Sequence, residues 1–253
     1  MMGMLRSACM RALRKVILRE VNDGQETMLR DLDAPIRRII ERVRPFTMTS
    51  DERLAALCSA VAHVVKHDVA GDFVECGVWK GGSTMAAALA FEASGDVGRH
   101  LYLFDTFEGM VEPTAVDRCA RTGKTAAHLL ATTSRSERIW AYSPLDEVKR
   151  NIASTGYPAE RVAFVKGKVE ETIPAFGPEK VAILRLDTDW YESTRHELVN
   201  LYPRLSVGGV LIIDDYGHWE GARRAVDEYF EEHRVRTFLH RIDYTGRIGI
   251  KTD

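Results

Sequence analysis

No apolar stretch in the 253-residue sequence approaches the roughly 20 residues that a membrane-spanning helix needs. We therefore expect no membrane partner. The basic, amphipathic segment 4–19 could be a targeting or membrane-surface helix. It lacks a long apolar centre and a small-residue cleavage site, and acidic residues follow it directly, so we expect neither a signal peptide nor an anchor.

Cysteine is scarce, and no basic run is interleaved with aromatic residues. Four widely spaced cysteines form neither a disulfide framework nor the CxxC pairs of a zinc site, so we expect a reducing, cytoplasmic location. The net charge of −2 gives no general reason to bind nucleic acid. A small molecule is the expected partner. The cysteines are Cys9, Cys58, Cys76 and Cys119.

The length fits one large α/β domain with an N-terminal extension. Residues 1–44 are charged, and apolar residues recur every three to four positions in 36–43, which predicts helices that act as a lid or a dimer contact. Residues 45–253 should form the main domain. Strand-like and helix-like patterns alternate there and end in a hairpin at 237–250, which predicts a mostly parallel sheet with one antiparallel member.

Local signals predict where several elements begin and end. Residues 49–51 offer an N-cap for a helix. Thr194 and Glu197 have the spacing of a capping box, and the glycines at 208–209 predict a turn into a strand. The polar, irregular segment 109–142 is expected to be an insertion that is flexible or ordered by a ligand.

A strand, a glycine-bearing turn and a helix start are predicted between Phe73 and Ser83. Gly77 would let the backbone approach a ligand, and the amide-rich helix start favours an anionic group. The spacing is not GxGxxG, which weakens a nicotinamide-cofactor interpretation. Glu75 at the strand end would repel a dinucleotide phosphate but suits a cationic ligand such as S-adenosylmethionine (SAM). A turn that only packs strand on helix is the alternative.

Asp105 closes the next strand-like run, one helix further along the chain. In nucleotide-binding α/β folds, an acid at this position accepts hydrogen bonds from ribose hydroxyls. A solvated strand-end acid or a helix cap is the alternative. Because Glu75 and Asp105 close consecutive strands of one βαβ unit, the pair favours a cofactor site.

Two further apolar runs end in acids: Asp187 and Asp189 follow one, and Asp214 and Asp215 follow the other. If the two strands are parallel neighbours, these carboxylates meet at one edge of the sheet. Converging carboxylates repel one another unless a cation or solvent relieves them, and hard oxygen ligands suit Mg²⁺ or a similar divalent ion. Aspartate pairs also form simple turns, which is the alternative.

Histidine and aromatic residues flank these acids. His218 could orient or deprotonate a substrate, or it could cap a helix or hydrogen-bond a ligand. Trp190 and Tyr191 could form a wall that stacks on a sugar, or they could fill the core.

Taken in order, five motifs resemble the macrocin O-methyltransferase family, which includes macrolide deoxysugar and aminocoumarin noviose O-methyltransferases. The resemblance runs over about residues 42–230. It implies a class I, Rossmann-like fold with a mostly parallel seven-stranded sheet and a C-terminal antiparallel hairpin. It also implies SAM- and Mg²⁺-dependent methylation of a hydroxyl on a small molecule, such as the deoxysugar of a natural-product glycoside. The motifs are Arg44–Thr49, Val74–Ser83, Asp105–Met110, Leu186–Asp189 and Asp214–Trp219.

The family pattern, carried over position by position, implies a set of site residues. Asp187, Asp214 and Asp215 would be metal ligands, and Asp189 or His218 would be the catalytic base. Residues 1–40 and 111–140 correspond least; such regions shape acceptor recognition and assembly in these enzymes, and a homodimer is expected. The implied cofactor contacts are Thr47, Met48, Glu75, Cys76, Gly77, Val78, Trp79, Ser83, Asp105, Thr106, Phe107, Glu108, Gly109, Ser143, Val169, Glu170 and Asp187.

Two other functions fit parts of the same pattern. A metal-dependent glycosyltransferase also uses a DxD pair, but it would leave Glu75 and the glycines at 81–82 without a role. A non-catalytic SAM-binding module would keep the cofactor site without transferring a methyl group. The complete set of aspartates argues against the second alternative.

Overall fold

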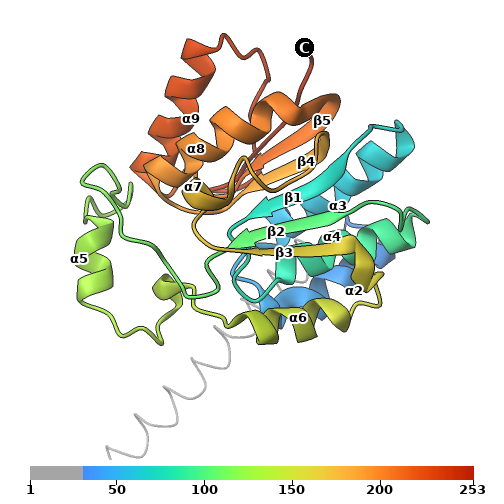
Figure 1. The fold of residues 1–253 in the computed structure, drawn as a ribbon, viewed down its shortest axis with the longest axis horizontal. Helices are drawn as coiled ribbons and strands as arrows, with labels where there is room; N and C mark the ends of the chain where they lie inside the picture. The colour runs from blue at the N-terminus through green and yellow to red at the C-terminus, as the bar shows by residue number, and fades with distance from the viewer. Residues whose placement is uncertain (1–30) are drawn as a thin grey trace, which may run out of the picture. The chain divides into compact units, whose positions relative to one another are not determined.

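One sheet of seven strands lies at the centre of the computed structural model, which describes residues 31–253 (Figure 1). The strands are β1 (Asp72–Cys76), β2 (Leu101–Asp105), β3 (Val162–Lys166), β4 (Val181–Leu186), β5 (Leu205–Ile213), β6 (His240–Arg241) and β7 (Arg247–Ile250). Their order is β3-β2-β1-β4-β5-β7-β6. Strands β1 to β5 are parallel, whereas β7 runs antiparallel to β5 and β6. The expected Rossmann-like sheet with its closing hairpin is confirmed.

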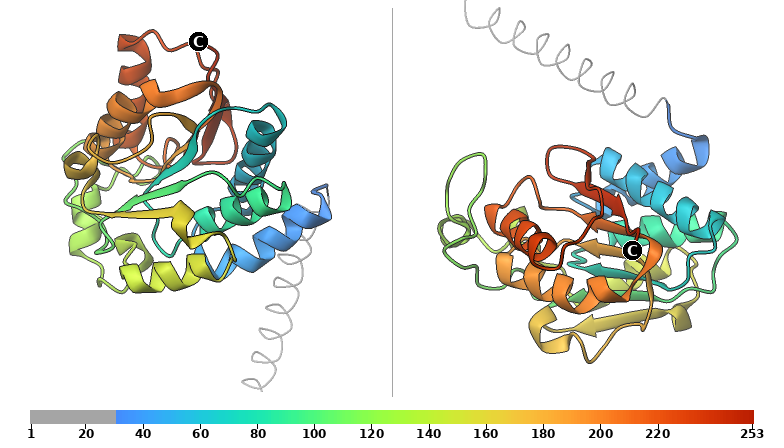
Figure 2. Two further views of the ribbon diagram at one scale, coloured as in Figure 1. Left: turned by 45° about the vertical axis from the view of Figure 1, so that its right-hand side comes forward. Right: turned by 90° about the horizontal axis from the view of Figure 1, so that it is seen from above.

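Helices cover both faces of the sheet (Figures 1 and 2). One face carries α3 (Asp51–Lys66), α4 (Gly82–Ala93) and α6 (Leu145–Ala153). The other face carries α7 (Val169–Thr172), α8 (Tyr191–Leu201) and α9 (Glu220–Glu232). The remaining helical segments are α2 (Ala34–Val43), α5 (Ala126–Ala131), η1 (Arg44–Phe46), η2 (Arg138–Trp140), η3 (Ala159–Arg161) and η4 (Tyr202–Arg204).

The central strands are apolar because helices cover them on both sides, as is usual for parallel sheets. Every position of β4 is buried, and so is the second half of β5. A single charged residue, Arg185, interrupts the apolar run of β4. At α4 the same burial extends around the helix, which is rich in alanine and sits against the sheet.

Three local predictions had different outcomes. Ser50 caps α3 as expected, because its hydroxyl accepts a hydrogen bond from the Arg53 N–H. The capping box is wrong: α8 begins at Tyr191, so Thr194 and Glu197 lie inside the helix. The two glycines at 208–209 do not precede a strand but lie within β5, where Gly208 has φ +83°.

Residues 39–253 form one compact unit; most of the remaining unit, 1–38, lies outside the described residues, as does segment 4–19. The expected helical pattern at 36–43 is confirmed by α2, while the domain boundary at residue 44 stays a prediction. Within residues 31–253, no helix combines the length and apolarity needed to cross a membrane.

Candidate active site

A pocket of about 520 Å³ opens where the parallel strands end. Its walls come from the turns that follow β1 to β5, so the predicted meeting of strand-end residues at one sheet edge is confirmed. The predicted residues that line it are Thr47, Met48, Gly77, Val78, Trp79, Ser83, Asp105, Thr106, Gly109, Val169, Glu170, Asp187, Asp189, Asp214, Asp215 and His218.

Asp105 fastens the glycine turn to the end of β2. Its Oδ2 accepts hydrogen bonds from the N–H groups of Val78 at 2.6 Å and Trp79 at 3.1 Å, and its Oδ1 accepts one from Phe107 at 2.6 Å. Trp79 and Phe107 have left-handed backbones, with φ of 47° and 53°, which is unusual for bulky residues. Burial raises the pKa of Asp105, and these hydrogen bonds oppose the shift. Asp105 is therefore neither a helix cap nor a solvated acid, and a ribose would share it with three backbone groups.

Gly77 brings the glycine turn into backbone contact with the loop after β4. Its φ is +83°, and a Cβ there would lie 2.0 Å from the carbonyl oxygen of Asp187. On the same strand end, the Asp187 N–H donates to the Cys76 carbonyl at 2.8 Å. Only glycine fits this position, so the two halves of the predicted site touch directly.

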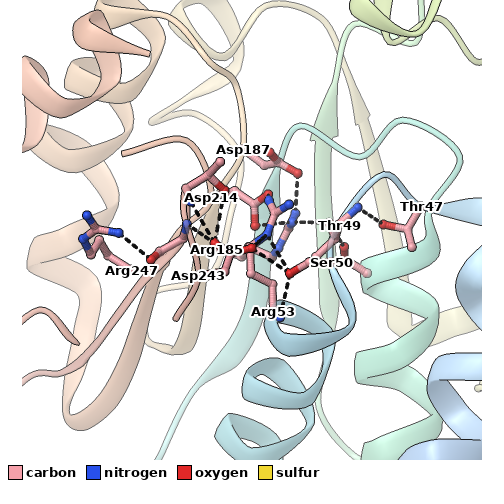
Figure 3. Close-up of polar contacts among 12 residues, drawn as sticks. Thr47, Thr49, Ser50, Arg53, Arg185, Asp187, Asp214, Asp243 and Arg247 are labelled. Atoms are coloured by element: carbon pink, nitrogen blue, oxygen red, sulfur yellow. Dashed lines mark hydrogen bonds and ion pairs between the residues drawn. The ribbon is translucent and has the colours of Figure 1, made fainter. Parts of the chain in front are cut away.

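Arg185 is a buried cation beneath the pocket, and the sequence analysis missed its role (Figure 3). Its Nη1 donates to Glu75 Oε1 and Asp187 Oδ2, each at 2.7 Å. Its Nη2 donates to Asp214 Oδ1 at 2.7 Å and to Thr49 Oγ1 at 3.0 Å. The signal available beforehand was a lone arginine in an apolar strand, where a buried charge requires partners.

Glu75 therefore does not face the pocket as an unpaired negative charge. It is 1% exposed, pairs with Arg185 and accepts a hydrogen bond from the Thr84 hydroxyl. Burial raises its pKa, and the Arg185 charge is the main opposing effect. Any influence of Glu75 on a cationic ligand is thus reduced by the adjacent guanidinium.

Arg53 of α3 is a second cation at the site. Its Nη1 pairs with Asp214 Oδ2, and its Nε donates to Asp243 Oδ2 at 2.9 Å (Figure 3). Asp243 lies in the turn between β6 and β7, and the Ser50 hydroxyl also donates to it at 2.7 Å. The two oxygens of Asp214 are thus each held by an arginine, which ties α3 and the C-terminal hairpin to the acids.

The three predicted metal ligands lie together. Asp187, Asp214 and Asp215 each offer a carboxylate oxygen within 4.8 Å of the other two. Asp215 Oδ2 is buried without a hydrogen-bond partner. Burial, then repulsion by Asp189 and Asp214, raises the pKa of Asp215, and burial likewise raises that of Asp187. Asp215 thus has an oxygen without a partner, and the site holds more carboxylates than Arg53 and Arg185 can balance. Both features fit a divalent cation with oxygen ligands.

Asp189 and His218 both line the pocket beside these acids. Asp189 has φ 68°, and burial together with the Asp187 charge raises its pKa to about 7. His218 is half-buried, and burial lowers its pKa, which favours the neutral imidazole at pH 7. Each group could accept a proton, as predicted, and the choice between them stays a prediction.

Two tryptophans form the inner side of the pocket. Trp190 and Trp219 pack edge to face with ring centroids 4.9 Å apart, and they are 2% and 4% exposed. Trp190 mainly fills the core, and its Nε1 donates to the Val111 carbonyl at 3.1 Å. The Tyr191 hydroxyl points to Glu228 instead. Apolar residues of the insertion complete this cluster; they are Met110, Val111, Cys119, Ala126, Leu129, Leu130, Ile139 and Trp140.

Contacts within the protein join the insertion to the sheet-edge loops, while its expected flexibility or ordering by a ligand stays a prediction. Asp117 is fully buried, and its Oδ1 accepts a hydrogen bond from the Tyr191 N–H at the start of α8, at 2.8 Å. It sits against Gly221, where a Cβ would lie 1.9 Å from the same oxygen. A backbone hydrogen bond from the Ala120 N–H to the His218 carbonyl, at 2.8 Å, joins the insertion to the neighbouring loop.

Five predicted cofactor residues do not line the pocket. Cys76 and Phe107 are buried, as is Ser143, whose Oγ has no hydrogen-bond partner. Glu108 is exposed and pairs with Lys166 at 2.8 Å. Glu75 is the fifth of these residues, and the cofactor roles of all five stay predictions.

Comparisons with known proteins show to which family the chain belongs. The chain matches the family described as Macrocin-O-methyltransferase (TylF) over residues 7–248. It is 37% identical over 204 residues to 8-demethyl-8-(2,3-dimethoxy-alpha-L-rhamnosyl)-tetracenomycin-C 4'-O-methyltransferase of Streptomyces olivaceus, covering 79% of this chain and 73% of that protein. It is 35% identical over 200 residues to demethyldecarbamoylnovobiocin O-methyltransferase of Streptomyces niveus, with the same coverage of 79% and 73%.

A solved structure is similar over most of the chain. The O-methyltransferase NovP matches with a TM-score of 0.71 at 33% identity, covering 82% of this chain and 83% of that one. Family membership excludes the glycosyltransferase and the non-catalytic module as alternatives. The resemblance seen in the sequence is thus confirmed, and the chain is a methyltransferase that belongs to the macrocin O-methyltransferase (TylF) family.

Proposed function

We propose that the protein transfers a methyl group from SAM to a hydroxyl of a natural-product glycoside, with a deoxysugar as acceptor and Mg²⁺ as required metal. The observation that carries this proposal is the presence, in one pocket, of the glycine turn after β1 and the aspartates after β4 and β5. The relatives named above support the acceptor class, as does mycinamicin III 3''-O-methyltransferase of Micromonospora griseorubida, 32% identical over 200 residues.

The donor would lie along the turns after β1 and β2. Gly77 lets the backbone come close, and Asp105 holds the turn in its left-handed shape. Thr47 and Met48 close the same side of the pocket. SAM supplies a positively charged sulfonium methyl when bound, and a pocket with surplus carboxylates favours a cation.

The acceptor would lie between the donor and the aspartates. Asp187, Asp214 and Asp215 would hold Mg²⁺, which lowers the pKa of a hydroxyl that contacts it. Asp189 takes the hydroxyl proton on a carboxylate oxygen, with the His218 imidazole as the other candidate. Arg185 fixes the carboxylates of Asp187 and Asp214, so the chain contributes mainly by positioning the two reactants.

Methyl transfer from isotope-labelled SAM to a panel of demethylated glycosides, with Mg²⁺ or with EDTA, tests the proposal. We expect label in an acceptor only when the metal is present. Asp187→Ala should lose both Mn²⁺ binding and turnover, whereas Asp189→Asn should keep the metal and lose rate. Asp146→Asn, an exposed change outside the pocket, is the matched control.

Each outcome bears on one part of the proposal. Turnover that EDTA does not affect would remove the metal from the reaction. Unchanged turnover in Asp189→Asn would remove that residue as the base and leave His218. Transfer to no glycoside in the panel, together with transfer to another hydroxyl compound, would overturn the acceptor class.

A further inference from the structure

Glu197 is a buried acid on α8 that the proposed mechanism does not use. Its side chain is 0% exposed, and its Oε1 accepts a hydrogen bond from Thr188 Oγ1 at 2.9 Å. Its Oε2 is buried and has no partner. Thr188 is the residue between Asp187 and Asp189, so Glu197 contacts the middle of the loop that carries a candidate metal ligand and the candidate base.

The surroundings of Glu197 favour a neutral carboxyl group. Burial is the main cause that raises its pKa well above the usual range, and the charges that add to the shift are carboxylates, those of Glu170, Asp187 and Asp215. A neutral carboxyl beneath the loop acts through hydrogen bonds and adds no further negative charge to the aspartates.

The loop depends on such contacts because its backbone is unusual. Asp189 has a left-handed φ of 68°, which costs energy in a residue with a side chain unless its neighbours stabilise it. On one side the loop touches Gly77. On the other, the Thr188 carbonyl accepts hydrogen bonds from the Trp190 N–H at 2.8 Å and the Ser193 hydroxyl at 3.4 Å. Among the described residues, the only hydrogen bond of the Thr188 side chain is to Glu197.

We propose that Glu197 is a positioning residue: through the Thr188 hydroxyl it fixes the loop so that Asp187 faces the metal and Asp189 faces the acceptor hydroxyl. The inference rests on the proposed function, since it assumes those roles for the two aspartates. Hydrogen bonds made directly to a metal ligand are typically worth about 10–100-fold in metal affinity, and Glu197 acts one residue away from Asp187, so we expect an effect near the lower end of that range.

Titration calorimetry with Mn²⁺ alone and with S-adenosylhomocysteine, on the full chain, tests the inference. Glu197→Leu removes the acceptor at similar volume and should weaken Mn²⁺ binding about tenfold. Glu197→Gln keeps an oxygen for Thr188 and should bind Mn²⁺ nearly as the wild type does. Both should keep S-adenosylhomocysteine affinity. Leu198→Ala, a change in the buried apolar core on the same helix, should lose stability without losing Mn²⁺ affinity.

The Thr188→Val variant provides a second route. It should weaken Mn²⁺ binding as Glu197→Leu does, and the double variant should be no weaker than either, because both remove one interaction. Additive losses would overturn the inference, as would unchanged affinity in Glu197→Leu or an equal loss in Glu197→Gln. If the wild type bound no Mn²⁺, the proposed metal site would fail and the inference with it. If the wild type bound Mn²⁺ and Glu197→Leu bound it with the same affinity, only the inference would fail.

Discussion

Replacement of Arg185 by methionine should destabilise the fold strongly. The guanidinium is buried and contacts three carboxylates, of which Glu75 and Asp214 are themselves 1% and 3% exposed. Removing one partner of a buried ion pair costs about 3–5 kcal/mol, because the other charge stays buried without compensation. For a domain of this size, about 2–4 °C per kcal/mol predicts a fall in Tm of about 6–20 °C.

The pH dependence of this loss identifies its cause. Without Arg185, the main effect that lowers the pKa of Glu75 disappears, so the folded-state pKa rises further above the unfolded value. Between the unfolded and the folded pKa of Glu75, the native variant binds a proton that the unfolded chain does not. The free energy of unfolding of the variant therefore falls as the pH rises through the folded pKa, and it recovers as the pH falls toward the unfolded pKa of about 4.3. The deficit measured by circular dichroism should therefore be larger at pH 8 than at pH 5.

The matched control is Arg224→Met, which removes the exposed pair with Glu228 on α9. Water screens that pair, so the Tm should stay near the wild-type value. The reasoning about Arg185 would be refuted if Arg185→Met melted within about 2 °C of the wild type, less than a 1 kcal/mol loss typically produces. It would also be refuted if the deficit grew as the pH fell.

Two further predictions concern the insertion and the C-terminal turn. Gly221→Ala places a methyl group against Asp117, so it should loosen the insertion and speed tryptic cleavage at its basic residues. Gly98→Ala, where the nearest atom to a Cβ is 3.9 Å away, should not. Cleavage at the wild-type rate in Gly221→Ala would contradict the anchoring role of Asp117. Although burial opposes it, hydrogen bonds from Gly246 and Ser50 and the Arg53 charge lower the pKa of Asp243. The contribution of the Asp243 carboxylate to stability should therefore be present above about pH 4 and be lost as the pH falls through its folded-state pKa. The Tm difference between wild type and Asp243→Asn should then shrink in acid.

Much of the fold follows from periodic patterns in the sequence. The alternation of apolar strands and amphipathic helices specifies β1 to β5 and their covering helices, because each pattern reflects burial on two faces or on one. The capping box at Thr194 failed because Glu197 has a different partner, Thr188, which precedes the helix. The turn predicted at 208–209 was wrong because a long strand can include an irregular position that a local pattern does not reveal.

The candidate site was predictable only in part. Strand-end acids such as Asp187 and Asp214 can be recognised because topology brings the ends of parallel strands together. Their counter-charges could not be paired beforehand: Arg53 reaches the acids from α3, far away in sequence, and Arg185 lies inside a strand. Burial of Glu75 beneath the pocket likewise depends on packing, which strand-end position alone does not determine.

The way the insertion is attached affects how this enzyme could change during evolution. Several of its hydrogen bonds to the rest of the protein use main-chain groups, such as the carbonyls of Val111 and Arg118, which every amino acid supplies. The side chains of Leu129 and Ile139 line the pocket and pack against the cluster around Trp190 and Trp219, but they make none of those hydrogen bonds. Selection could therefore exchange them for other apolar side chains and adapt the enzyme to a new acceptor while these main-chain hydrogen bonds stay the same.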